Sequence, residues 1–217
     1  KTSPYLLFKS DTTERSTLRG VNNGTGLKAT VYRNYAYWND NYGLDQYNHS
    51  GFTIPMQPPS VYTGVDINYD RRVSAGRNKL GLTRNSHFYK IVWEGYLTLR
   101  KTGSANTTDV EGEYRFSVAA DNSFKLWIDD KLLLNAFPNE PVYYNNPFNT
   151  TLLSDPVKLY HGKKYRVRVE HTDGEGEGIA RLNWKKPTGN PAAVIPIINF
   201  HSTLAAAEAA IQKQTTS

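Results

Sequence analysis

Apolar and polar residues alternate along much of the chain, and this period of two restricts its fold more than any other feature of the sequence. The alternation is clearest in residues 114–130, "YRFSVAADNSFKLWIDD". Read at every second residue, this stretch gives one apolar series: Tyr114, Phe116, Val118, Ala120, Phe124, Leu126 and Ile128. Such a series predicts β-strand that shelters a core. Asn122 breaks the series in the core-facing register, with Asp121 beside it, so this polar pair is a candidate for function.

Further segments show the same alternation: "GLKATVYRN", "KIVWEGYLTLR", "DPVKLYHGKKYRVRVEH" and "IARLNWKK". Asp129 and Asp130 predict the turn of a hairpin. Short antiparallel strands separated by turns indicate an all-β fold, an antiparallel β-sandwich with long surface loops. We expect Trp93 and Trp184 in its core, whereas Trp127 has the opposite parity from its apolar neighbours.

The segments without alternation suggest the domain boundaries. Residues 35–90 are rich in Tyr, Asn, Gly and Pro, which predicts long loops with a short strand or two, and such loops are usually functional. The tail, "STLAAAEAAIQKQTTS", favours a short terminal helix or a linker. We therefore expect an N-terminal extension over residues 1–25, a sandwich domain over residues 26–200, and a C-terminal helix or linker over residues 201–217.

Composition and charge exclude several classes of protein. The sequence has 217 residues and no cysteine, which excludes disulfides and thiolate metal sites. No apolar run approaches the roughly 20 residues of a membrane helix, so we expect no membrane insertion. Residues 1–110 hold 14 basic and 8 acidic residues, and the run "RRVSAGRNKLGLTR" suits phosphates or sulfated sugars. Because no aromatic residues alternate with these bases, a solvated loop is favoured and nucleic acid is not an expected partner.

Catalytic motifs are absent from the sequence. The five histidines form no metal pair at helical spacing, and there is no G-x-S-x-G elbow or phosphate-binding glycine loop. The carboxylates of Asp129 and Asp130 are better explained as turn residues than as an acid–base pair acting on sugars. The glutamates of "GEGEG" would repel phosphate. We therefore expect that the protein is not an enzyme.

Two oxygen-rich segments indicate a site for a hard cation. Asp121 and Asn122 offer side-chain oxygens, and the loop "HTDGEGEG" offers acidic side chains and a permissive backbone. Ca²⁺ prefers six to eight oxygen ligands at about 2.3–2.6 Å. Adjacent strand residues point to opposite faces, so the backbone must distort for Asp121 and Asn122 to face one ion. A second interpretation stays open, in which Asn122 caps a bulge and Asp121 is merely exposed.

Longer segments together resemble the PA14 domain family, a module named after a bacterial toxin component. They are "GLKATVYRN", "IVWEGYLTLRKTGSANTTDVEGEYRFSVAADNSFKLWIDDKLLLN", "LYHGKKYRVRVEHTDGEGEGIARLNW" and "VIPIINF", and they span residues 26–200. The resemblance implies a β-sandwich of the kind found in bacterial adhesins, glycosidases, binary toxins and yeast flocculins. In its lectin members, two consecutive aspartates joined by a cis peptide hold Ca²⁺, which grips vicinal sugar hydroxyls, and a second loop completes the site.

The resemblance transfers to this chain residue by residue. The metal ligands that it implies are Asp121, Asn122, Asp173, Glu175 and Glu177. The residues expected near a bound sugar are Asp121, Asn122, Tyr143, Tyr144, Asn145 and His171. Aromatic faces stack on sugar C–H groups and amides bond to hydroxyls, which is why Tyr and Asn are candidates. His171 continues an inward strand face into the acidic loop, so core and site edge are both open for it.

The chain departs from the lectin pattern at Asn122, which keeps an oxygen but removes a charge and lowers the expected calcium affinity. The "ADN" spelling also resembles toxin members, for which sugar binding is not implied, yet no tetrabasic cleavage sequence follows the domain. The absence of cysteine favours a bacterial protein over the flocculin branch. We expect a calcium-dependent carbohydrate-binding domain of a larger secreted or cell-surface protein, with a glycan or polysaccharide as partner. The alternatives are a protein-interaction or pro-domain, and an accessory domain of a glycosidase.

Overall fold

Strands dominate the described part of the chain, as the alternation predicts. The structure, a computed structural model, describes residues 24–33, 48–49, 52–53, 58–70, 80–82, 89–101, 108–121, 123–135, 153–173, 178–189 and 191–215. Within these residues, no helix has the length and apolar character needed to cross a membrane.

The described strands form two larger antiparallel sheets. The seven-stranded sheet contains β1 (Leu27–Arg33), β4 (Ser60–Val65), β6 (Tyr89–Thr98), β8 (Ser123–Ile128), β9 (Lys131–Asn135), β11 (Lys164–Asp173) and β14 (Phe200–His201). Its order is β4-β1-β6-β11-β8-β9, with β14 also pairing with β6. The five-stranded sheet contains β5 (Asn68–Asp70), β7 (Gly112–Asp121), β10 (Val157–Leu159), β12 (Ile179–Lys185) and β13 (Ala193–Val194). Its order is β10-β7-β12-β13, with β5 also pairing with β12. A separate short ladder joins β2 (Asn48–His49) to β3 (Phe52–Thr53).

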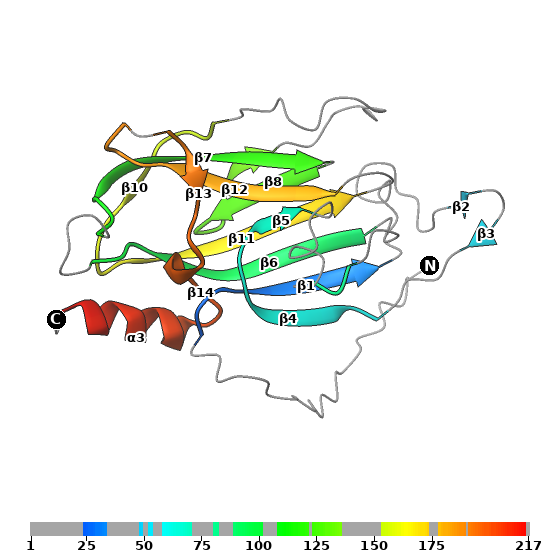
Figure 1. Cartoon of the computed structure of the whole chain (residues 1–217), viewed down its shortest axis with the longest axis horizontal. Helices are drawn as coiled ribbons and strands as arrows, with labels where there is room; N and C mark the ends of the chain where they lie inside the picture. Colours follow the sequence, from blue (N-terminus) through cyan, green and yellow to red (C-terminus); the bar gives the residue numbers. More distant parts are fainter. Residues whose placement is uncertain are drawn as a thin grey trace, which may run out of the picture.

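The core lies between the two larger sheets, which form the layers of the sandwich in Figure 1. Trp93 on β6 is 0% exposed and Trp184 on β12 is 1% exposed, so both are core residues as predicted. The ring of Trp184 packs at 5.1 Å from that of Tyr114 on β7. The inward residues of the sandwich are thus the apolar members of the period-two pattern.

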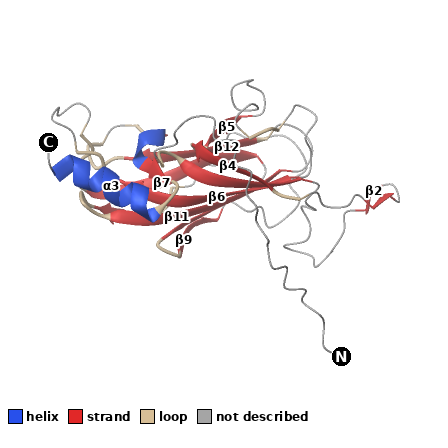
Figure 2. Ribbon diagram, turned by 90° about the horizontal axis from the view of Figure 1, so that it is seen from below, coloured by secondary structure: helices blue, strands red, loops and turns tan. Residues whose placement is uncertain are grey.

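The predicted terminal helix is present as α3 (Leu204–Thr215), which follows the short 3₁₀ helix η1 (Ile197–Asn199) and β14. It lies along one end of the sandwich, where Figures 1 and 2 place it beside the seven-stranded sheet. Ala207 is fully buried against the sandwich. Lys164, at the start of β11, pairs with Glu208 at 2.5 Å. The helix therefore marks the end of the sandwich where β11 begins.

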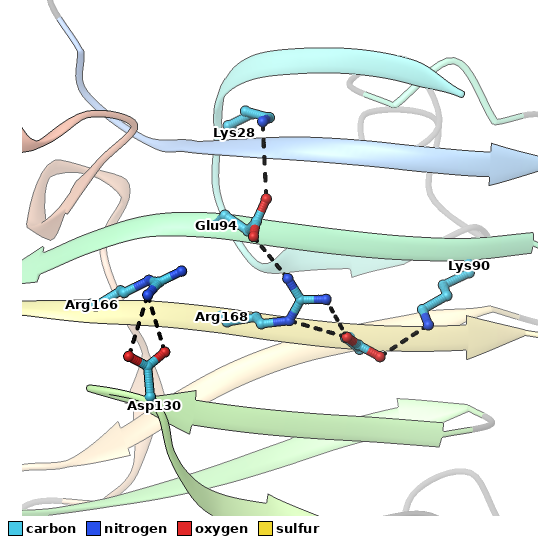
Figure 3. Close-up of polar contacts among 7 residues, drawn as sticks. Lys28, Lys90, Glu94, Asp130, Arg166 and Arg168 are labelled. Carbon is cyan, nitrogen blue, oxygen red and sulfur yellow. Dashed lines mark hydrogen bonds and ion pairs between the residues drawn. The ribbon is translucent and has the colours of Figure 1, made fainter. Parts of the chain in front are cut away.

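The turn between β8 and β9 explains the carboxylate pair at the hairpin tip. Asp129 and Asp130 have φ of 49° and 64°, which matches a two-residue hairpin turn of type I′. The backbone N–H of Arg166 donates to Asp129 Oδ1 at 2.7 Å. The Arg166 guanidinium pairs with Asp130 at 3.2 Å (Figure 3). Both acids therefore serve the turn, as the sequence favoured.

The polar break in residues 114–130 coincides with a change of sheet. Asp121 ends β7 in the five-stranded sheet, and Ser123 begins β8 in the seven-stranded sheet. The inward parity continues through the change, since Ala120 is 8% exposed and Phe124 is 0% exposed. The chain thus passes from one sheet to the other while its apolar side chains keep facing the core, as happens where a strand leaves one sheet of a sandwich and joins the other. Asn122 itself lies outside the described residues.

A ladder of charges covers part of the outer face of the seven-stranded sheet. Arg168 donates to Glu94 at 2.8 Å and also to Glu170 at 2.5 Å. Lys90 pairs with Glu170 at 3.0 Å, and Lys28 pairs with Glu94 at 4.0 Å (Figure 3). Burial would raise the pKa of Glu170, but hydrogen bonds from Arg168 and Lys90 outweigh it and lower this pKa. Glu170 is therefore held by two basic residues, one on each side of it.

Replacing Glu170 with Gln should lower the free energy of unfolding at neutral pH by about 1–3 kcal/mol, because it removes charge-assisted hydrogen bonds from a half-buried site. A group whose pKa is lower in the folded state stabilises the protein above its unfolded-state pKa, and loses that contribution as the pH falls through the folded-state value. The difference between wild type and Glu170→Gln should therefore shrink in acid. Urea unfolding from about pH 7 to about pH 3 measures it.

The control for this substitution is Asp130→Asn, which removes a carboxylate whose side chain is 74% exposed. Such exposed pairs contribute about 0–1 kcal/mol. Equal losses in the two variants, or a Glu170→Gln effect that does not change with pH, would contradict the prediction.

Candidate functional site

The strand ends that flank two crossings between the sheets lie side by side, at the end of the sandwich opposite α3. The first crossing follows Asp121, the last residue of β7, and the second follows Asp173, the last residue of β11. Asp121 pairs with Ile179, where β12 resumes the five-stranded sheet. Thr172 pairs with Ser123, where β8 enters the seven-stranded sheet. In Figure 1, β7 and β11 accordingly end on the same side of the sandwich.

The two acids that end these strands lie at the same end of the sandwich. Asp173 is 1% exposed and has the inward parity of β11. A Cβ atom built on Gly178 would lie 3.2 Å from the Asp173 carboxyl group. Gly178 directly precedes Ile179, the partner of the half-buried Asp121, which has the outward parity of β7. The structure thus places one acid from each predicted segment at the same end of the sandwich, with Asp173 facing the core and Asp121 facing outward.

Two buried tyrosines pack in the core beneath this end of the sandwich, which we call the rim, and we call them, together with His171, the floor of the site. The hydroxyl groups of Tyr69 on β5 and Tyr89 on β6 are 3.0 Å apart, so their hydrogen bond joins the two sheets. The Tyr89 hydroxyl lies so close to Gly178 that a Cβ atom there would be within 1.9 Å of it. Sequence reasoning missed both tyrosines, because they lie in the weakly periodic residues 35–90.

His171 belongs to the same floor. Its ring lies 6.1–6.4 Å from the rings of Tyr69, Tyr89 and Trp93, and it is 0% exposed. Burial lowers the pKa of His171 to about 4, although the hydrogen bond to the Ser123 carbonyl at 2.8 Å opposes this shift. The ring is therefore neutral at neutral pH. Of the two positions left open for His171, the structure shows the core, so the ring has no surface to offer a sugar.

Other buried acids near the sheets have structural partners. Asp70, which pairs with Ile179 from the side opposite Asp121, accepts a hydrogen bond from Arg181 at 2.5 Å. Asp109, at the α3 end of the sandwich, accepts from Lys186 at 2.6 Å and from Asn199 at 2.7 Å. These bonds neutralise or satisfy each carboxylate within the fold, as buried charges require.

The remaining predicted site residues lie outside the described residues: Asn122, Tyr143, Tyr144, Asn145, Glu175 and Glu177. Among the residues that are described, no group of three or more metal-binding side chains gathers. The carboxylate oxygens of Asp121 and Asp173 are nonetheless the donors that a hard cation prefers. The described rim therefore offers the oxygen donors that calcium prefers.

Comparisons with known proteins agree with this architecture. The sequence profile of the PA14 domain matches residues 24–196. The protective antigen of Bacillus anthracis is 22% identical over 120 residues, which cover 55% of this chain and only 12% of that protein.

Solved structures with the same fold include three of low sequence identity. The PA14 domain of the antifreeze protein MpAFP has a TM-score of 0.52 at 15% identity, covering 82% of this chain and 90% of that one. A PA14 sugar-binding domain from an RTX adhesin has a TM-score of 0.51 at 17% identity, covering 82% and 98%. The epithelial adhesin 6 A domain of Candida glabrata, in complex with Galβ1-3GlcNAc, has a TM-score of 0.53 at 17% identity, covering 85% and 89%.

Replacing Gly178 with Ala should destabilise the protein by about 1–3 kcal/mol, because the new methyl group overlaps the Tyr89 hydroxyl and presses on Asp173. Adding Tyr89→Phe should recover part of this loss, since it removes the atom that the methyl group meets most closely. Urea unfolding of the two single variants and the double variant measures the coupling.

Gly162→Ala is the matched control. Gly162 has φ of +68° but no atom within 4 Å of its Cβ position, so its substitution costs backbone strain alone. Tyr89→Phe should give it no recovery. Strictly additive losses in Gly178→Ala and Tyr89→Phe would show that the close approach at Gly178 has no energetic role.

Proposed function

This chain belongs to the PA14 domain family, and on that premise we propose that it is a calcium-dependent carbohydrate-binding module of a secreted or cell-surface protein. The sugar-binding and adhesin neighbours favour a binding role over catalysis. The partner is a glycan or polysaccharide outside the cell.

One observation supports this proposal above the others, namely that two acid-bearing crossings lie together at one rim. Asp173 is buried there beside Gly178, and Asp121 pairs with the residue that follows Gly178. Because a buried carboxylate interacts more strongly with a cation than an exposed one does, Asp173 is the stronger of the two ligands. Asn122, Glu175 and Glu177 are the further ligands of the proposed shell. When bound, the calcium ion supplies coordination positions for two neighbouring sugar hydroxyls.

We propose that the sugar itself contacts the tyrosines and the asparagine that the sequence predicts for this role. Tyr143, Tyr144 and Asn145 supply aromatic faces and an amide, which suit the C–H surface and the hydroxyls of a sugar. The neighbour from Candida glabrata was solved with Galβ1-3GlcNAc, so β-galactosides are the first ligands to test.

A second function, a protein-interaction module without sugar binding, is favoured by a separate observation. The curated relative that the chain matches is the protective antigen rather than a lectin. Asn122 also replaces an acid of the lectin pattern, which reduces the negative charge available to a divalent ion. Calcium binding distinguishes the two functions.

Asp173→Asn should weaken calcium binding more than about tenfold, since even outer partners of metal ligands contribute 10–100-fold. Asp121→Asn should have a smaller effect in the same direction. Terbium, which replaces calcium and emits when an aromatic residue is near, is a suitable probe because Tyr89 pairs directly with Asp173. Terbium titration with calcium competition gives the affinities, and a glycan array with calcium or with a chelator gives the ligand.

Asp130→Asn is the control, because this exposed carboxylate lies at the hairpin tip and pairs with Arg166. It should leave both terbium emission and glycan binding unchanged. A wild-type protein that binds neither metal, or a glycan signal that persists after chelation, would overturn the calcium-dependent function.

A further inference from the structure

Ser123 is tied to two consecutive residues of β11 at the first position of β8. Its carbonyl accepts from His171 Nδ1 at 2.8 Å. Its hydroxyl lies 2.5 Å from the Thr172 hydroxyl and accepts from the Thr172 backbone N–H at 3.2 Å. All three residues are buried, with exposed fractions of 3%, 0% and 4% for Ser123, His171 and Thr172. We call this group the Ser123–His171–Thr172 clamp.

The clamp lies between the two acids of the candidate site. Ser123 follows Asp121 by two residues, and His171 precedes Asp173 by two residues. Strand pairing alone places Ser123 opposite Thr172, but a pairing at the very end of two strands frays easily. Side-chain bonds from both His171 and Thr172 prevent that fraying, so they hold the first crossing against the second.

We propose that His171 is a positioning residue for the candidate cation site, acting through the hydrogen bond from its Nδ1–H to the Ser123 carbonyl. This inference rests on the proposed function and identifies the group that sets the distance between Asp121 and Asp173. A ligand set held by such an outer partner is preorganised, and the ion does not have to order the crossings when it binds.

The surroundings of His171 explain why an imidazole suits this position better than an apolar side chain. Tyr69, Tyr89 and Trp93 pack around the ring and set its orientation. Tyr69 belongs to the five-stranded sheet and His171 to the seven-stranded sheet. Residues of both sheets therefore pack against the His171 ring. The Ser123 carbonyl can only accept, so the hydrogen bond requires a proton on Nδ1.

The test compares variants that keep or lose a donor at the position of Nδ1. An asparagine amide reaches roughly the same place as Nδ1, whereas a glutamine amide reaches the place of Nε2. His171→Asn should therefore retain terbium affinity within about threefold, and His171→Leu should lose 10–100-fold. In the metal-free protein, backbone amides of residues 121–123 and 171–173 should exchange about tenfold faster in His171→Leu than in wild type or His171→Asn.

His201→Leu is the matched control for loss of a buried histidine. His201 is 4% exposed, bonds to the Thr98 hydroxyl at 2.9 Å, and pairs with Tyr96. Tyr96 and Tyr89 lie on the same strand, roughly 20 Å apart. His201→Leu should lower the melting temperature but leave both terbium affinity and amide exchange at residues 121–123 unchanged.

The outcomes separate this inference from the proposed function. A wild-type protein that binds no terbium or calcium overturns the calcium function, while amide exchange in the metal-free variants still decides the role of His171. If His171→Asn behaves like His171→Leu, or if His201→Leu affects the rim equally, His171 is a packing residue and the inference is wrong. Should His171→Leu fail to fold, His171→Gln replaces it, with the same expected contrast to His171→Asn.

Discussion

The burial of two alternating apolar faces against each other is the constraint on which the rest of this structure depends. A single core covered by both sheets requires the chain to pass from one layer to the other at the ends of the sandwich. Backbone groups lose their ladder partners at such passages and need other partners. The crossings after Asp121 and after Asp173 therefore collect polar side chains at the rim of an apolar core. The candidate site is a consequence of the topology.

The buried polar groups beneath this rim are fixed in position by their hydrogen bonds. Tyr69 and Tyr89 share one hydrogen bond across the sheets, and His171 donates to the Ser123 carbonyl. A buried polar group that loses its partner is costly, so each of these bonds holds its neighbours in one geometry. Gly178 adds a steric condition, because a side chain there would displace the Tyr89 hydroxyl. The rim is consequently supported by a rigid base.

Period-two alternation predicted the sandwich, the core tryptophans and the hairpin turn because each depends on local chemistry. It could not predict that the series around Asn122 passes between sheets, since inward parity is the same before and after the crossing, as Ala120 and Phe124 show. His171 was ambiguous for a similar reason, because parity shows which face of the strand a side chain lies on but not how deeply it is buried. The contact between Tyr69 and Tyr89 depends on long-range packing that no pattern in residues 35–90 reveals.

The sandwich and the chemistry of its rim are constrained separately. Neighbours of 15–17% identity keep the fold, because many apolar residues can fill an inward position. A cation site has no such freedom, since its affinity depends on the charge and position of a few oxygens. An amide at residue 122 lowers the negative charge at the first crossing. More of the attraction for a cation then has to come from the acids of the second crossing. In the proposed site, buried Asp173 therefore has the larger share, because its field is screened least by solvent.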